Sequence, residues 1–200
     1  MGKTIGIIGA GNISRAVAKH LLKAGHQVLL SNSRGPESLN EMVAALGNGI
    51  TAVTTAEAAK ADIVVLALPW TKLDTVTGLT DWKDKLVIDA TNHYISVEPE
   101  FITADLGDRA SSEVTAEHVP GADLVKAFNT LFFKVLEADP AYGGGKRVLF
   151  YSGGTAKAKQ TVNDLIDSMG FSPIDLGDLH HGSKLHQAKG PLSGKNLIEM

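Results

Sequence analysis

A glycine turn near the start of the chain has the residue types that phosphate binding requires. Gly9-Ala10-Gly11 follows an apolar run at 4–8 and precedes a segment at 13–22 in which apolar residues recur at helical spacing. Glycine adopts turn torsions cheaply and, without a Cβ, lets backbone N–H groups approach a pyrophosphate closely. The positive end of the next helix faces the same turn, and we expect Asn12 to cap that helix. The pattern therefore predicts an anion site.

One position departs from the GxGxxG pattern, because its third glycine is Ser14 in this chain. Serine is small enough to allow close packing of helix against strand. The competing interpretation is an ordinary strand-to-helix turn. It must explain why the motif follows a strand, opens a helix at Ile13 and leads into a helix stop and a second apolar strand over residues 25–30.

The second strand ends at Asn32-Ser33-Arg34, where an NAD-binding chain usually has an acidic residue for the ribose 2′-OH. No acid is present there. Arg34 can instead bind a 2′-phosphate, with Ser33 and backbone N–H groups as further donors. At about 1.5–3 kcal/mol for each charged hydrogen bond, NADPH should be favoured over NADH by about tenfold to a hundredfold. The alternative is that Arg34 is a solvated loop charge.

Polar and aromatic residues follow three later strands of the expected sheet. In open α/β sheets, ligands bind beyond the carboxyl ends of the strands. The residues at these positions are Leu68, Pro69, Trp70, Thr91, Asn92, His93 and Asn129. We expect them to line the cofactor pocket, with Asn92, His93 and Asn129 as candidates to polarise the acceptor. The alternatives are a partly buried core aromatic for Trp70, a turn residue for Asn92 and a surface histidine for His93.

Strands and helices alternate along the chain and predict an α/β, Rossmann-type, doubly wound and mostly parallel sheet. We expect residues 1–130 to form the NADP(H)-binding domain and residues 131–200 a small C-terminal α/β lobe on the same sheet, beside the acceptor. Expected strands are 4–8, 27–30, 50–53, 63–68, 86–89, 124–128, 147–151 and 171–175, and expected helices are 13–22, 40–46, 55–61 and 155–168, with a crossover at 96–121 and an apolar helix after Thr130.

Composition narrows the class of protein. The 200 residues are 44% hydrophobic, enough for one sizeable α/β domain, and the formal net charge of −3 argues against a nucleic-acid partner. There is no cysteine, which excludes disulfides and thiolate metal sites. No apolar run is long enough to suggest a membrane span, so we expect no membrane partner and a cytoplasmic location.

Three local patterns are misleading. Tyr142 and Lys146 have the spacing of a short-chain dehydrogenase pair, but the three glycines between them predict a loop rather than a helix. Pro140 and Arg147 break a P-loop pattern over the same segment. His180, His181 and His186 are expected to lie in a polar tail loop, and we predict no metal site.

Taken together, several segments resemble the coenzyme F420-dependent NADP oxidoreductase family. They are Gly9-Ala10-Gly11-Asn12, Ser33-Arg34, Leu68-Pro69-Trp70, Lys126-Ala127-Phe128-Asn129-Thr130 and Gly170 to Leu179. The resemblance implies contacts with NADP(H) from Ala10, Asn12, Ile13, Ser33, Arg34, Pro69 and Trp70. It also implies a C-terminal lobe that shapes the deazaflavin site, and a homodimer. The family usually has Gly-Asp-Asp where this chain has Gly153-Gly154-Thr155, and the tail after Leu179 differs as well.

The leading hypothesis is hydride transfer between NADP(H) and a flat, small-molecule acceptor, F420 or a flavin. Such transfer depends on stacking the two rings in a dry slot, so no general acid or base is required, and none is assigned. One alternative is a non-catalytic NADP(H)-binding module that senses redox state. A weaker one is an isomerase or lyase that holds the nucleotide permanently.

Overall fold

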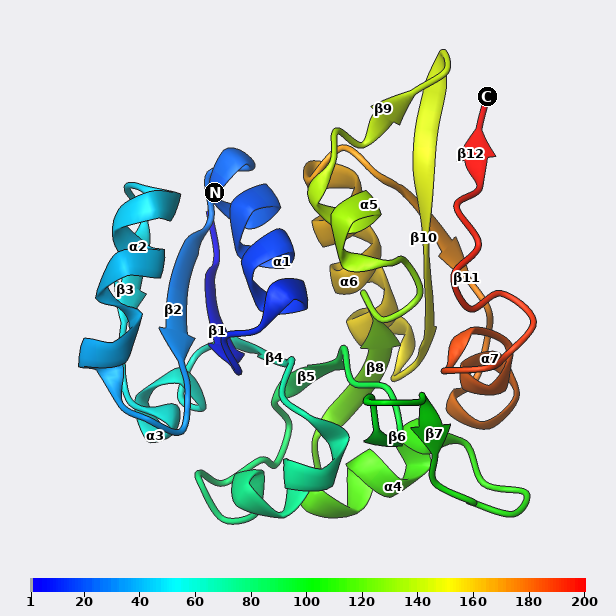
Figure 1. Ribbon diagram of the computed structural model, residues 1–200, viewed down its shortest axis with the longest axis horizontal. Coiled ribbons are helices and arrows are strands. Elements are labelled where there is room, and N and C mark those ends of the chain that lie inside the picture. Colours follow the sequence, from blue (N-terminus) through cyan, green and yellow to red (C-terminus); the bar gives the residue numbers. More distant parts are fainter. Residues whose placement is uncertain (1) are drawn as a thin grey trace.

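The fold is a doubly wound α/β sheet, seen here in a computed structural model that describes residues 2–200 (Figure 1). The strand order is β11-β10-β8-β5-β4-β1-β2-β3. All neighbours in this order are parallel except β10, which runs antiparallel to β8. The strands are β1 (Thr4–Ile8), β2 (Gln27–Ser31), β3 (Ile50–Ala52), β4 (Ile63–Leu66), β5 (Leu86–Asp89), β8 (Asp123–Ala127), β10 (Gly145–Gly153) and β11 (Ser172–Asp175).

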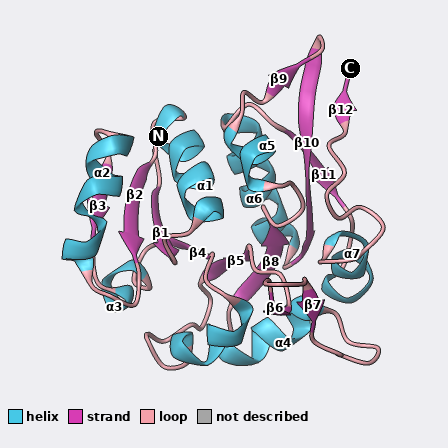
Figure 2. Ribbon diagram, viewed as in Figure 1, coloured by secondary structure: helices cyan, strands magenta, loops and turns pink. Residues whose placement is uncertain are grey.

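Helices cover both faces of this sheet (Figure 2). They are α1 (Asn12–Lys23), α2 (Asn40–Leu46), α3 (Thr55–Ala58), α4 (Ser111–His118), α5 (Phe133–Glu137), α6 (Ala156–Ser168) and α7 (Leu179–His186), with 3-10 turns η1 (Pro36–Leu39) and η2 (Trp70–Val76). Short strands β6 (Tyr94–Ser96) and β7 (Ile102–Thr103) form a separate hairpin, while β9 (Ala141–Tyr142) and β12 (Ile198–Glu199) pair with β10.

Alternation along the central strands produces two hydrophobic cores. Val65 of β4 belongs to the core formed with α1 and α6, whereas its neighbours Val64 and Leu66 belong to the core on the η2 side, with Trp82. A parallel strand covered on both faces buries every residue, as β4 does. The sequence therefore predicted these strands as continuous apolar runs.

The predicted doubly wound architecture is confirmed, including the bounds 40–46 and 86–89. Tyr142 and Lys146 lie on the strands β9 and β10, so the expected absence of a helix there is confirmed. The tail prediction was wrong, because the histidines belong to helix α7, whose N-cap Asp178 accepts a hydrogen bond from His181 N. An acidic residue before a helix is a cap signal that the sequence did carry.

Candidate cofactor and acceptor site at the carboxyl edge of the sheet

The turn after β1 requires glycine at its first position. Gly9 has φ +115°, and a Cβ there would lie 2.1 Å from the carbonyl oxygen of Ala67. Its N–H donates to the carbonyl of Ser31, so the turn is tied to the end of β2. Ser14, in place of the third glycine, is fully buried and donates from Oγ to the same Ala67 carbonyl at 3.3 Å. The serine thus links α1 to the end of β4.

The start of α1 is open for an anion. Gly11 is the N-cap, and a Cβ there would meet nothing within 4 Å. No side chain caps the helix and no acid lies in its first turn, so the prediction that Asn12 caps it was wrong. Asn12 is instead the first helical residue and is exposed, while Ala10 and Ile13 pack partly against the core. Free backbone N–H groups and the dipole therefore face an uncrowded turn.

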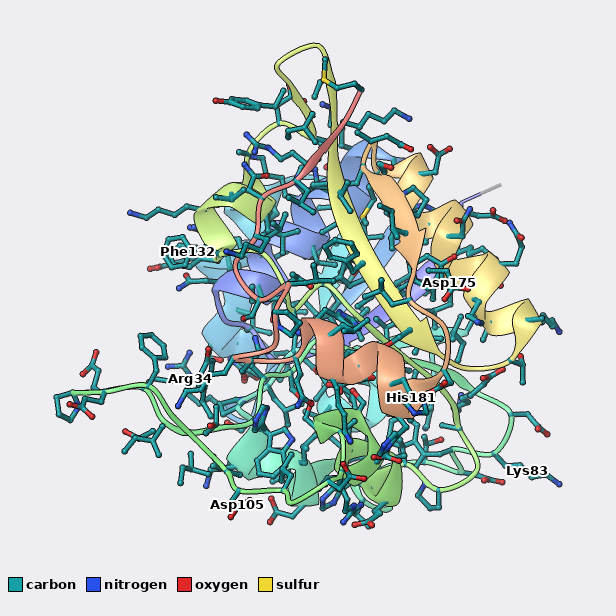
Figure 3. All side chains as sticks on the ribbon, turned by 90° about the vertical axis from the view of Figure 1, so that its right-hand side faces the viewer. Arg34, Lys83, Asp105, Phe132, Asp175 and His181 are labelled. Atoms are coloured by element: carbon teal, nitrogen blue, oxygen red, sulfur yellow. The ribbon has the colours of Figure 1, made fainter. Side chains whose placement is uncertain are left out.

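The loop after β2 holds its backbone in place through Asn32. The Asn32 Oδ1 atom accepts from Arg34 N at 2.9 Å, and Nδ2 donates to Ser38 Oγ. Ser33 and Arg34 are exposed, and no hydrogen bond or ion pair to the Arg34 guanidinium exists among residues 2–200. Figure 3 shows Arg34 and Phe132 on the same side of the molecule, opposite Lys83 and Asp175. The guanidinium is available for a ligand.

At the end of β4, the loop turns directly into η2. Pro69 is exposed and N-caps η2, and Leu68 and Trp70 are half-buried against the η2-side core. The Trp70 ring contacts the His93 ring edge to face, with centroids 6.4 Å apart. Trp70 therefore packs partly against the core and partly lines the proposed pocket. Its Nε1 atom is buried without a hydrogen-bond partner in the described residues.

An ion pair without solvent exposure lies under the ends of β5 and β8. Lys126 Nζ is 3.2 Å from Asp89 Oδ2, and both side chains are 0% exposed. Lys126 also donates to the carbonyl of Thr91, and the Thr91 N–H and hydroxyl donate to Asp89. Burial alone would raise the pKa of Asp89, but Lys126 and the hydrogen bonds from Ser112 and Thr91 hold that pKa below its usual value. The pair fixes the loop that carries Thr91 and Asn92.

The side chains that follow this ion pair form a buried group. Asn92 Nδ2 donates to the carbonyl of Asn129 at 3.0 Å, and Asn129 is 4% exposed. His93 is 6% exposed, so the alternative interpretation as a surface histidine was wrong. Burial, and then the positive charge of Lys126, lower the pKa of His93, which keeps its ring neutral at pH 7.

The role of His186 on α7 could not be predicted from the sequence. His186 is fully buried, its Nε2 lies 2.9 Å from Ser152 Oγ, and its carbonyl accepts from Asn129 Nδ2 at 2.7 Å. Burial lowers the pKa of His186 to about 3. Asn129 and His186 are 57 residues apart, so no local sequence pattern reports their contact, and only the fold reveals it.

The structure thus gathers the predicted cofactor residues at the carboxyl ends of β1, β2, β4 and β5, which parallel pairing places along one edge. A cavity of about 640 Å³ opens at the other edge, where Ile63 and Leu86 begin β4 and β5, and it includes none of these residues. No His, Cys, Asp and Glu cluster suited to a metal occurs in residues 2–200. In the same described range, no helix has the length and apolar character needed to cross a membrane.

A family model described as NADP oxidoreductase, coenzyme F420-dependent, matches residues 4–93, which carry the glycine turn, the Arg34 loop and the loops after β4 and β5. Over residues 4–93 the chain therefore matches this family, as the sequence predicted. A proposed F420-dependent NADP reductase of Arthrobacter sp. FB24 has a similar structure, with TM-score 0.72, 25% identity, and coverage of 88% of this chain and 86% of that one. The family match and this similar structure support a Rossmann fold of the NADP oxidoreductase type.

Two other relatives extend the comparison over the rest of the chain. A hypothetical protein of Sinorhizobium meliloti has TM-score 0.92 and 42% identity, covering 100% of this chain and 97% of that one. Metalloreductase STEAP3 of Rattus norvegicus is 29% identical over 178 residues, 88% of this chain. The chain spans about a third of the length of this metalloreductase, 34%.

Proposed function

We propose that the protein is an NADP(H)-dependent oxidoreductase that exchanges a hydride with a flat small-molecule acceptor such as F420 or a flavin. The observation that carries the proposal is the Arg34 guanidinium, which is exposed and has no partner among residues 2–200. Its backbone is held by the Asn32 hydrogen bond in the loop after β2, the strand that pairs with β1. A side chain in this position suits a 2′-phosphate, which NADP(H) has and NAD(H) lacks.

The open turn at Gly11 supports a place for the pyrophosphate, because a phosphate can approach the backbone there without meeting a side chain. The strand order reverses between β1 and β4, and dinucleotides bind across such a switch point. The adenosine half would then lie over β2, in contact with Asn32, Ser33 and Arg34. The nicotinamide half would lie over β4 and β5, and when bound it supplies the hydride.

The acceptor would bind beyond the nicotinamide, toward the end of β8. Phe132, 58% exposed and tilted against Phe133 with ring centroids 4.5 Å apart, offers a flat apolar surface on the same side of the molecule as Arg34 (Figure 3). Apolar side chains also lie exposed on the β6–β7 hairpin, at Ile95, Phe101 and Ile102. We include in the proposal a homodimer in which a second copy covers part of this surface.

The test compares NADPH and NADH binding to the wild type and to Arg34→Ala by calorimetry. Loss of the charged hydrogen bonds should raise the NADPH dissociation constant about tenfold to a hundredfold, while the NADH constant changes little. Arg109→Ala removes an equal charge from an arginine that pairs with Glu117, and it should leave both constants unchanged. Equal losses for both nucleotides in Arg34→Ala would refute the role of Arg34.

Turnover tests the acceptor. NADPH oxidation is followed with F420, FMN, quinones and ferric chelates, the last because the rat relative is described as a metalloreductase. Oxidation with F420 or FMN supports the proposal. Tight NADPH binding without oxidation by any acceptor would favour a non-catalytic, redox-sensing module instead.

A further inference from the structure

Three buried polar atoms that have no hydrogen-bond partner among residues 2–200 lie at neighbouring strand ends. They are Trp70 Nε1 after β4, His93 Nδ1 after β5 and Asn129 Oδ1 after β8. His93 and Asn129 are 6% and 4% exposed, and the Trp70 and His93 rings are in contact. Buried polar groups are nearly always paired in folded proteins, so unpaired ones at the carboxyl ends of the strands point to a ligand site.

The orientation of the Asn129 amide follows from its neighbours. Its nitrogen donates to Asn92 Oδ1 at 3.2 Å and to the carbonyl of His186 at 2.7 Å. The Asn92 nitrogen itself donates to the Asn129 carbonyl, so the Asn92 oxygen must be the acceptor. Both contacts therefore require the nitrogen of Asn129, which leaves Oδ1 as a free acceptor.

Backbone strain marks the same position. Phe128, directly before Asn129, has φ +68° and is 1% exposed. A bulky residue adopts this conformation rarely and only where the surrounding structure enforces it, and such strain is common at ligand sites. The turn at Phe128 ends β8 and presents Asn129 beside Asn92.

We propose that Trp70, His93 and Asn129 hold the carboxamide of the nicotinamide ring. The indole N–H donates to the carboxamide oxygen, and Asn129 Oδ1 accepts from the carboxamide NH₂. The neutral His93 ring adds one more donor or acceptor, according to its tautomer. This inference rests on the proposed function, because it requires the nicotinamide half to lie over β4 and β5.

The position of these side chains in the fold favours the nicotinamide carboxamide, rather than a polar group of the acceptor, as their ligand. Trp70 and His93 follow the two strands nearest to the glycine turn on the far side of the switch point, where the second half of a dinucleotide reaches first. A flavin or deazaflavin ring has a similar edge of carbonyls and N–H. The experiment therefore contains no acceptor, so that only the nucleotide can bind.

Calorimetry measures binding of NADP⁺, of its 3-acetylpyridine analogue and of 2′,5′-ADP. The analogue keeps the carbonyl but has a methyl group in place of the NH₂, and 2′,5′-ADP lacks the nicotinamide half. The wild type should bind NADP⁺ about three- to tenfold more tightly than the analogue, the effect of one hydrogen bond. Asn129→Ala should weaken NADP⁺ alone and bring this ratio close to one.

Trp70→Phe keeps an aromatic ring and removes the indole N–H. It should weaken NADP⁺ and the analogue by a similar factor, about three- to tenfold, and leave 2′,5′-ADP unchanged. Trp82→Phe is the matched control, because the Trp82 N–H donates to the carbonyl of Val76 in the core. It should change none of the three dissociation constants.

The carboxamide assignment is overturned if the wild type binds NADP⁺ and the analogue equally, if Asn129→Ala keeps the ratio, or if Trp70→Phe changes nothing. Should Asn129→Ala fail to fold, the wild-type ratio and Trp70→Phe decide the matter. Failure of the wild type to bind 2′,5′-ADP would instead contradict the proposed function. If 2′,5′-ADP binds but NADP⁺ does not bind more tightly than the analogue, only the carboxamide assignment is wrong.

Discussion

Two parts of the carboxyl edge are built in different ways. The outer part, after β1 and β2, is exposed and held by backbone contacts such as Gly9 N to the Ser31 carbonyl. The inner part, after β5 and β8, is buried and held by side chains from distant segments, such as Lys126 on Asp89 and Asn129 on the His186 carbonyl. The exposed side chains of the outer part can be changed with little effect on folding, whereas the side chains of the inner part also support the fold.

This difference follows from the ligand that each part is proposed to bind. A phosphate is charged and hydrated, so it suits an exposed guanidinium and free N–H groups. A nicotinamide ring is flat and neutral at its carboxamide, so it suits a dry site with fixed partners. Fixed partners in a dry site need their own buried hydrogen bonds, and these are what Lys126 and His186 supply.

The largest expected effect is on the inner part. Lys126→Met leaves the Asp89 carboxylate buried without its ammonium partner, and this should lower the free energy of unfolding by about 3–5 kcal/mol. Denaturant unfolding measures the loss. Arg34→Ala, on the outer part, should change the unfolding free energy by no more than about 0.5 kcal/mol.

A second variant separates charge from packing. Adding Asp89→Asn to Lys126→Met keeps an oxygen for the Thr91 hydrogen bonds and removes the buried charge. The double variant should recover about 1–3 kcal/mol relative to Lys126→Met. If the losses of unfolding free energy caused by Lys126→Met and by Asp89→Asn simply add in the double variant, the ion pair is not what couples these strands.

The same division explains what the sequence could predict. The glycine turn and the Arg34 loop depend on residues a few positions apart, so their types and order were visible at once. The burial of His93 was not visible, because nothing near it in the sequence reports the Trp70 ring that contacts it or the Lys126 charge that lowers its pKa. The fold was predictable from continuous apolar runs that alternate with helical segments. Helix α7 was missed because its polar sequence does not suggest the buried contacts of His186.

Two glycines of the outer turn test whether its backbone serves folding or binding. Gly9→Ala forces a Cβ against the Ala67 carbonyl at a positive φ, and should cost about 2–3 kcal/mol of unfolding free energy. Gly11→Ala meets open space and should leave stability unchanged to within about 0.5 kcal/mol, but weaken NADPH because the methyl group occupies the phosphate approach. Thermal unfolding and calorimetry measure the two effects, and a stable Gly9→Ala would show that this turn is more adaptable than its geometry suggests.

A more gradual effect is expected in the pH dependence of stability. The pKa of His186 is about 3 in the fold and about 6.5 in the unfolded chain, so the unfolded state binds one more proton between these values. Stability is then complete above about pH 6.5 and falls by up to about 1.4 kcal/mol per unit as the pH drops toward 3. Lowered pKa values at His93 and Asp89 act in the same direction.

His186→Gln keeps a polar amide group near Ser152 but replaces a buried ring, so it should lower stability at pH 7. Because glutamine does not titrate, the dependence of stability on pH should be flatter between pH 6.5 and 4.5. Over that range the wild type should lose about 2–3 kcal/mol more than the variant, measured by denaturant unfolding at each pH. His181→Gln changes an exposed histidine on the same helix and should keep the wild-type slope. Equal slopes for wild type and His186→Gln would mean that His186 protonates without opening the inner part, and the division between a rigid inner and a tolerant outer part would no longer hold.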